Sequence, residues 1–209
     1  MKKRLLKCIP LISNRTKIVI STLLLILAIA MCAFRPESIS SKICIGAMLC
    51  SFIGDIVLNC TPLEKRPHSL LYIGASFFMI AHVIYALAYY VLITQLQVIF
   101  LNDGAFAAIV IMVLLFGMAM LCMKMTQVSL KPAMIFVFLL YILVISISFI
   151  TIYSYSRSSG AISFVGATLF LVSDYIIGIE NVFRIKSDTL RKLVWICYPI
   201  GQAIIIVCR

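Results

Sequence analysis

The chain alternates between long apolar runs and short polar connectors along nearly its whole length. A bilayer core about 30 Å thick takes roughly 20 apolar residues in a helix. Turn-forming residues such as Arg35-Pro36-Glu37 and Asn102-Asp103-Gly104 separate the runs. The pattern therefore predicts seven transmembrane helices, over Lys17–Phe34, Lys42–Cys60, Ser69–Ile93, Gly104–Met123, Pro132–Tyr153, Gly160–Glu180 and Leu193–Cys208.

The composition agrees with a membrane protein. Of the 209 residues, 64% are hydrophobic and only 12% are charged, whereas a soluble domain is about half apolar and about a quarter charged. A soluble fold of this size could not cover so much apolar surface. We expect an all-α, polytopic transmembrane bundle, with residues 1–16 as a basic N-terminal segment and residues 17–209 as a single membrane domain.

The distribution of positive charge predicts an orientation. The chain has 18 Lys and Arg against 7 Asp and Glu, and they lie in short loops rather than in a basic stripe interleaved with aromatics, so we expect no nucleic-acid partner. With a cytoplasmic N-terminus, 14 of these 18 basic residues are inside and 4 are outside, as the positive-inside rule requires. We predict this orientation and an integral, multi-pass location in a bacterial plasma membrane. The four outside residues are Arg35, Lys42, Arg157 and Arg209.

The first run has an alternative interpretation as a signal peptide. A basic start, an apolar stretch and Ala28-Ile29-Ala30 fit that pattern. The apolar stretch continues unbroken to Phe34, which favours a membrane span.

Two aspartates lie where lipid tolerates charge poorly. Asp55 and Asp174 lie five residues before Cys60 and six before Glu180, which places each about 8–9 Å from the end of its helix. An ionisable group at this depth costs several kcal/mol and is by default a functional candidate. Glu180 itself is at a boundary and is expected to be solvated. The two aspartates lie at matching depth on different helices, so we expect them to face one shared hollow. No Lys or Arg lies in the interior of the runs to neutralise them, so one of them would be protonated, bind a cation or share a proton with the other.

Further polar side chains recur at helical spacing within the runs. In the second run they form a stripe with Ser51 and Asp55, in the third they lie near mid-span, and in the last they flank Pro199, which we expect to kink the helix. They could line the same hollow, or they could only hydrogen-bond neighbouring helices, as polar membrane residues often do. The fourth run lacks such residues and is expected to face lipid. The candidates are Asn59, His82, Tyr85, Tyr198 and Gln202.

Residue counts exclude several kinds of catalysis. The only histidines are His68 and His82, so a three-histidine zinc site cannot be built. The sequence has no Gly-x-Ser-x-Gly elbow and no P-loop. We therefore expect no metal site, no covalent serine chemistry and no nucleotide hydrolysis.

Four segments carry a resemblance to a known family. They occur in the family's order and with similar spacing, and they are Ser51–Leu58, Gly74–Phe78 with Ala81–Tyr85, Gly166–Asp174 and Tyr198–Gln202. In these segments the chain resembles the lysoplasmalogenase family of membrane proteins, the YhhN-type hydrolases. Members of that family usually have about eight spans, one more than the pattern predicts here.

The resemblance implies hydrolysis of the vinyl-ether bond of lysoplasmalogens to a fatty aldehyde and a glycerophospho head group, without a cofactor. Protonation of the vinyl carbon forms an oxocarbenium ion, a step that calls for an acid and a nearby negative charge. The expected partners are a lysophospholipid substrate and membrane lipids. The hypothesis makes Asp55 and Asp174 the catalytic carboxyl groups and gives substrate-binding roles to Asn59, His82, Tyr85, Tyr198 and Gln202.

Two other functions could use the same residues. A small proton-coupled transporter would use the aspartates as a relay, whereas a non-catalytic lipid-binding protein would depend on them little. The sequence shows no inverted repeat and only one Pro-interrupted run, where carriers often have a matched pair. That observation favours the hydrolase over the transporter.

Overall fold

A computed structural model describes residues 13–59, 67–96, 110–111, 113–118, 120, 132–182 and 187–209. Within these ranges the regular structure is entirely helical, and six helices are long and apolar enough to cross a membrane. The prediction of an all-α, multi-pass membrane protein is thus confirmed. The six helices are α2 (Asn14–Phe34), α3 (Ile39–Asn59), α4 (His68–Gln95), α6 (Pro132–Ser159), α7 (Ile162–Val182) and α8 (Asp188–Val207).

The predicted span Gly104–Met123 is described only in part. Residues 110–111, 113–118 and 120 are helical, and the rest of this span lies outside the described residues. Val113 and Leu114 are 64% and 62% exposed, as expected for a lipid-facing segment, whereas Leu115 is buried and its carbonyl accepts a hydrogen bond from Tyr175. The predicted basic segment 1–16 lies largely outside the described residues, and the orientation of the termini stays a prediction.

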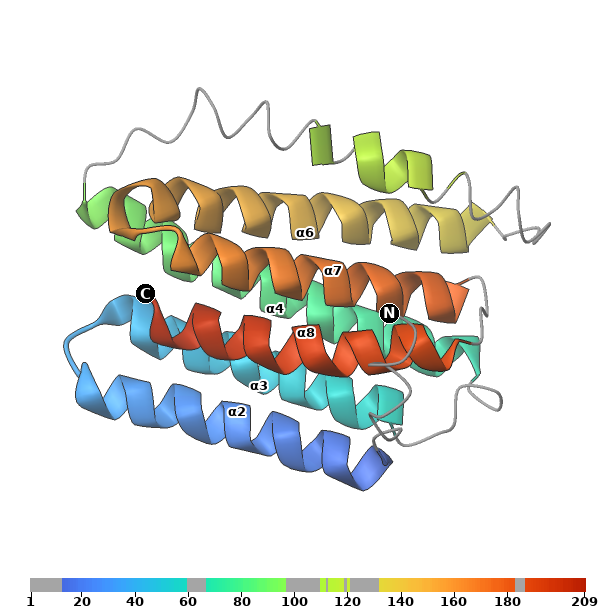
Figure 1. Cartoon of the computed structure of the whole chain (residues 1–209), viewed down its shortest axis with the longest axis horizontal. Coiled ribbons are helices and arrows are strands. Elements are labelled where there is room, and N and C mark those ends of the chain that lie inside the picture. Colours follow the sequence, from blue (N-terminus) through green and yellow to red (C-terminus); the bar gives the residue numbers. More distant parts are fainter. Residues whose placement is uncertain are drawn as a thin grey trace, which may run out of the picture.

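The helices form an elongated antiparallel bundle (Figure 1). Each described helix packs against the next along the chain, and α8 also contacts α2, so the first and last described helices lie side by side. At one end, which we call the Asn14 end, Asn14 donates a hydrogen bond to the carbonyl of Asn59. At the opposite end, the Arg209 end, Arg209 donates to the carbonyl of Ser40. The sequence predicts that the Asn14 end is cytoplasmic.

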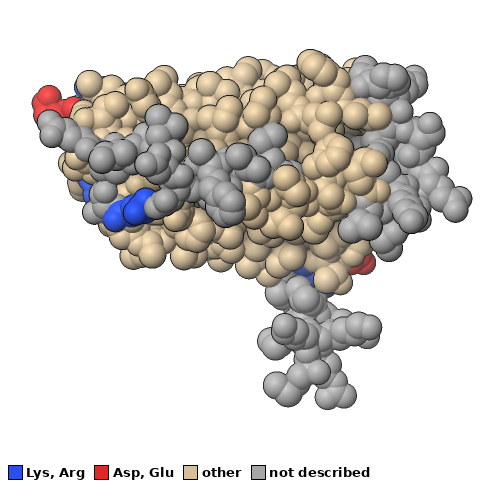
Figure 2. All heavy atoms as spheres, turned by 90° about the horizontal axis from the view of Figure 1, so that it is seen from above, with Lys and Arg blue, Asp and Glu red and all other residues tan. Residues whose placement is uncertain are grey.

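The surface has the pattern that a bilayer requires. On the face shown in Figure 2, Lys, Arg, Asp and Glu of the described residues lie towards the two ends, and the middle is uncharged. Large apolar side chains such as Leu23, Val83 and Phe136 are more than half exposed. Lipid rather than water is the solvent that suits such a belt.

Two helices extend beyond the apolar runs because polar residues support their ends. The α6 helix continues six residues past Tyr153, where hydroxyls such as that of Ser154 donate to carbonyls of the preceding turn. The α8 helix begins five residues before Leu193 because Ser187 caps it, accepting from the Leu190 N–H at 3.3 Å. It then continues through Pro199 to Val207. The kink predicted at Pro199 stays a prediction.

Glycines allow two helix pairs to approach closely at the level of the candidate residues. A Cβ on Gly201 would lie 2.7 Å from the backbone N of Phe170 and 2.8 Å from the carbonyl oxygen of Gly166. A Cβ on Gly54 would lie 2.9 Å from the ring of Phe78. The α7–α8 and α3–α4 contacts therefore have little space for intervening side chains, and they bring the polar faces of these helices together.

Candidate active site

Asp174 forms the centre of a buried cluster that joins three helices. Its Oδ2 atom lies 2.6 Å from Nε2 of His82 on α4 and accepts a hydrogen bond of 3.2 Å from the Tyr141 hydroxyl on α6. Asp174 and His82 are 1% and 2% exposed. The prediction that neither aspartate has a basic partner is therefore wrong for Asp174, because it considered Lys and Arg but not His82.

Aromatic rings hold the His82 side chain in place. Phe170, one helical turn before Asp174, stacks on the imidazole with ring centroids 4.6 Å apart and an interplanar angle of 19°. Tyr141 meets the same imidazole edge-on at 6.3 Å. The ring therefore has little freedom to rotate, and its Nε2 atom stays directed at the carboxyl group.

The second polar atom of each member of the pair has no protein partner. Within the described part of the chain, Nδ1 of His82 and Oδ1 of Asp174 are buried and make no hydrogen bond. Such an atom loses its hydration without compensation, at a cost of about 1–3 kcal/mol. Buried polar atoms of this kind in a folded protein call for an explanation, and a catalytic role is one.

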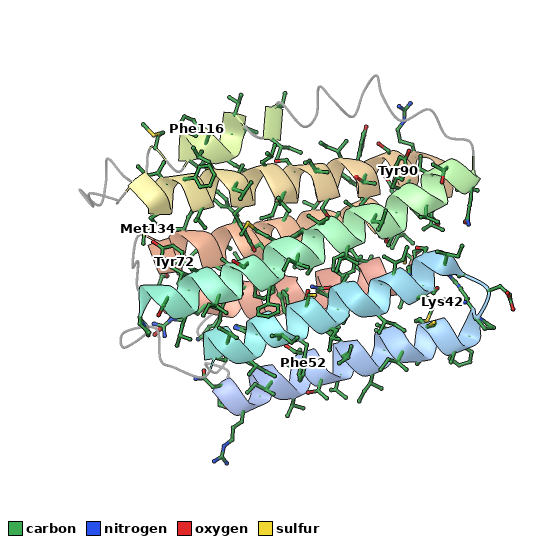
Figure 3. All side chains as sticks on the ribbon, turned by 180° about the vertical axis from the view of Figure 1, so that it is seen from behind. Lys42, Phe52, Tyr72, Tyr90, Phe116 and Met134 are labelled. Carbon is green, nitrogen blue, oxygen red and sulfur yellow. The ribbon has the colours of Figure 1, made fainter. Side chains whose placement is uncertain are left out.

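An apolar pocket lies beside Asp174. Its walls come from the last turn of α3, the first half of α4, the first half of α6 and the last half of α7. Figure 3 shows two of its lining residues, Tyr72 and Met134, at the same end of the bundle. Among the described residues of the lining, Asp174 alone has a carboxyl group. The lining residues are Leu58, Leu71, Tyr72, Ala75, Phe78, Met134, Val137, Phe138, Tyr141, Asp174, Ile177 and Gly178.

Asp55 belongs to a second cluster. Its Oδ2 atom accepts hydrogen bonds of 2.5 Å from the Ser21 hydroxyl on α2 and 2.6 Å from the Tyr198 hydroxyl on α8. Asp55 is 3% exposed, and it is not among the residues that line the pocket at Asp174. The two aspartates thus have separate hydrogen-bond partners, and Asp174 lines this pocket whereas Asp55 does not. The prediction that both face one shared hollow is therefore not met at this pocket.

Aromatic side chains connect the two clusters. The hydroxyl of Tyr198 donates to Asp55. The centroid of the Tyr198 ring lies 5.8 Å from that of Phe170, whose ring stacks on His82. Tyr198 also meets Phe78, one of the pocket residues, edge-on at 6.3 Å. The clusters are therefore in contact through packed rings.

The remaining predicted binding residues make hydrogen bonds within the protein. The hydroxyl of Tyr85 donates to Oε1 of Gln202 at 2.5 Å, and Nε2 of Gln202 donates to the Ser51 hydroxyl at 3.3 Å. Asn59 donates to the carbonyl of Asp55 in its own helix at 2.7 Å. The contacts of Tyr85 and Gln202 join neighbouring helices and fit the bridging role that the sequence left open, whereas the Asn59 contact stays within α3. A role in binding substrate stays a prediction for these residues.

The structure adds residues that the sequence did not single out. Ser21 and Tyr141 lie on helices for which no polar face was predicted, and Phe170 was given no role of its own. The sequence could have pointed to Ser21 and Tyr141 only as hydroxyl-bearing residues inside apolar runs. Glu180 corrects another expectation, since it is buried with 5% exposure rather than solvated.

The fold and the site together define a multi-pass helical membrane protein with a buried histidine–aspartate pair beside an apolar pocket. Within the described ranges, no three His, Cys, Asp or Glu side chains gather as a metal site. The chain belongs to the YhhN family, whose family model matches residues 15–208. This confirms the family resemblance found in the sequence. Comparison with curated proteins and with solved structures finds no significant match.

Proposed function

We propose that this protein is an integral-membrane hydrolase that cleaves the vinyl-ether bond of a lysoplasmalogen, releasing a fatty aldehyde and a glycerophospho head group. The observation that carries the proposal is the buried His82–Asp174 pair at the side of an otherwise apolar pocket. Membership of the YhhN family supports it.

The pocket suits a hydrocarbon chain that carries one reactive group. Side chains such as Leu71, Val137 and Ile177 offer only apolar contacts, which match an alkenyl chain. The polar groups of the lining are the Asp174 carboxyl group and the hydroxyls of Tyr72 and Tyr141. A lipid seated there would have its vinyl-ether carbons beside Asp174 and its hydrocarbon against the remaining walls.

The histidine–aspartate pair suits the first chemical step. A pair at 2.6 Å can share one proton, as imidazolium with carboxylate or as imidazole with carboxylic acid. In the proposed reaction the pair gives this proton to the β-carbon of the vinyl ether, and the C=C electrons form the new C–H bond. The resulting oxocarbenium ion is stabilised by the negative charge left at Asp174, as in glycoside hydrolysis.

Water completes the reaction and restores the proton. A water molecule adds to the oxocarbenium carbon and returns one proton to the pair, giving a hemiacetal. The hemiacetal C–O bond then breaks, the ether oxygen takes up the hydroxyl proton, and aldehyde and alcohol leave. The sum is one water consumed for each ether bond cleaved, without a cofactor.

In this proposal Asp55 acts as the second carboxyl group. Its Oδ2 atom accepts hydrogen bonds from the hydroxyls of Ser21 and Tyr198. The ring of Tyr198 in turn packs on Phe170 and Phe78. Asp55 therefore holds Tyr198 against the rings of the site and places a second carboxyl group behind them.

The direct test is product analysis with purified protein in detergent. Lysolipids that carry a vinyl-ether, an alkyl-ether or an ester chain are supplied separately, and fatty aldehyde is measured. The proposal expects aldehyde from the vinyl ether alone and almost none from an Asp174→Asn variant. Wild-type aldehyde release by that variant would contradict the proposal.

The same assay separates the hydrolase from the proton-coupled transporter. Detergent micelles hold no ion gradient, so a carrier has no driving force in them. Gradient-dependent lipid uptake in sealed vesicles, with no aldehyde produced in detergent, would favour the transporter.

A further inference from the structure

A second group of unsatisfied polar atoms lies at the Arg209 end of the bundle, away from the candidate active site. Ser40 Oγ, Ser41 Oγ and Arg209 Nη2 are buried and have no hydrogen-bond partner in the described part of the chain. The two serines are 1% exposed and Arg209 is 7% exposed. Since Nη1 of Arg209 donates to the Ser40 carbonyl at 3.3 Å, the guanidinium lies at the first turn of α3.

This group of residues is positively charged. Burial lowers the pKa of Arg209 to about 10, so the guanidinium is still protonated at neutral pH. The titratable groups that act on it are the Arg35 guanidinium and the Cys32 thiol, and Arg35 also donates a hydrogen bond to the main-chain oxygen of Arg209. A buried guanidinium whose Nη2 atom has no partner among the described residues is unfavourable unless an anion approaches it.

The first turn of α3 adds to this positive potential. A helix N-terminus carries a partial positive charge and unpaired N–H groups. The hydroxyl oxygen of Ser38 accepts a hydrogen bond of 3.2 Å from one of these groups, the Ser41 N–H. The hydroxyls of Ser40 and Ser41 are two further donors nearby. Guanidinium, hydroxyl and helix N-terminus are the groups that proteins use to bind phosphate.

We propose that Ser40, Ser41 and Arg209, at the N-terminus of α3, bind the phosphate group of a membrane phospholipid. The cluster lies at the end of a membrane-spanning bundle, which is the level of lipid head groups. Figure 3 shows Lys42, the next residue along α3, at the opposite end of the bundle from the pocket residue Tyr72. The phosphate site is therefore distinct from the candidate active site and does not depend on the proposed hydrolysis.

Thermal unfolding of the purified chain in detergent tests this proposal. Phosphatidylglycerol, diacylglycerol with the same chains, and inorganic phosphate are added in separate arms. Phosphatidylglycerol is expected to raise Tm by about 5–10 °C at a hundredfold excess over its dissociation constant. Diacylglycerol lacks the phosphate and is expected to leave Tm unchanged. An equal rise in Tm with diacylglycerol would overturn the proposal. A rise in Tm with inorganic phosphate but not with phosphatidylglycerol would show that the site binds free phosphate and not a lipid head group.

Matched variants locate the effect. Arg209→Gln is expected to abolish the rise in Tm, whereas Lys42→Gln removes the same charge from an exposed neighbour and is expected to keep it. A double variant, Ser40→Ala with Ser41→Ala, keeps the buried charge of Arg209 and is expected to weaken lipid binding at least tenfold. This double variant tests the site even if Arg209→Gln does not fold. A full response to phosphatidylglycerol in the serine double variant or in Arg209→Gln would refute the site.

Discussion

The imidazole of His82 and the carboxyl group of Asp174 meet at 2.6 Å although 92 positions separate them in the sequence. The contact bridges α4 and α7 inside a membrane-spanning bundle, where an isolated ionisable group is costly. Each residue reduces that cost for the other. Among the described residues, one polar atom on each partner also has no hydrogen-bond partner and could meet a reacting group.

Removal of the acid at Asp174 should abolish turnover. Asp174→Asn keeps the shape of the side chain but cannot pass a proton between His82 and a substrate. General acid catalysis typically contributes about 10²–10⁴-fold, so aldehyde release should fall at least a hundredfold. Asp188→Asn is the control, because that carboxyl group is 70% exposed in a surface pair with Arg191. Equal rates for the two variants would speak against a catalytic Asp174.

Loss of the Tyr141 hydroxyl should affect rate more than stability. Tyr141→Phe removes the hydroxyl that donates to Asp174 Oδ2 but keeps the ring against His82. We expect a fall in kcat of about two- to tenfold, in line with the 0.5–1.5 kcal/mol of an ordinary hydrogen bond. Tyr153→Phe on the same helix serves as the control, and it should leave kcat unchanged. A Tyr141→Phe enzyme with unchanged kcat would rule out this role of the hydroxyl.

The Ser21–Asp55 contact should stabilise the packing of α2. Ser21→Ala leaves Asp55 with a single hydroxyl donor in a buried place, and we expect a loss of about 1–3 kcal/mol in the free energy of unfolding. Thr22→Val is a neighbouring control, since that hydroxyl only donates to Ile18 in its own helix. Thermal unfolding in detergent measures both. A similar Tm for the two variants would show that the Ser21 bond contributes little.

The backbone contact between α7 and α8 should tolerate no added atom. Gly201→Ala places a Cβ 2.7 Å from the Phe170 backbone, which forces the helices apart and should cost about 1–3 kcal/mol. At Gly46 a Cβ would lie 3.9 Å from Ile84, an ordinary contact, so Gly46→Ala should change Tm little. We also expect lower activity for Gly201→Ala, because Phe170 stacks on His82. Unchanged Tm and activity in Gly201→Ala would contradict the tight packing.

The orientation of the chain can be tested by reporters. The 14-to-4 distribution of basic residues predicts that the Asn14 end is cytoplasmic. A cysteine placed at Ser13 should then be protected from an impermeant thiol reagent added outside intact cells, and one placed at Ser159 should react, in a chain whose native cysteines are replaced. The reverse pattern would invert the topology and place the pocket at the outer face.

Much of the fold could be predicted because the bilayer imposes a simple length rule on apolar runs. Predicted boundaries such as Phe34 and Pro132 coincide with helix ends in the structure. The errors lie where polar residues continue a helix, as after Tyr153 and before Leu193. There the hydroxyls and caps that satisfy the backbone are local interactions that a hydropathy pattern does not register.

The site was harder to predict than the fold. The sequence identified Asp55, Asp174 and His82 because polar residues are conspicuous in an apolar run. It could not show which of them meet, since rotation of each helix about its axis is set by packing, including the close contact at Gly201. The assignment of His82 to Asp174 and of Tyr198 to Asp55 therefore needed coordinates.

The distance along the chain between His82 and Asp174 has a consequence for biosynthesis. A nascent chain inserts α4 long before α7 is made, so His82 enters the membrane without its acid. Asp174 arrives later, when its partners His82 and Tyr141 are already in place. A ribosome that stops before α7 therefore leaves an inserted fragment without the carboxyl group and with one wall of the pocket missing, so activity should arise only when synthesis is nearly complete.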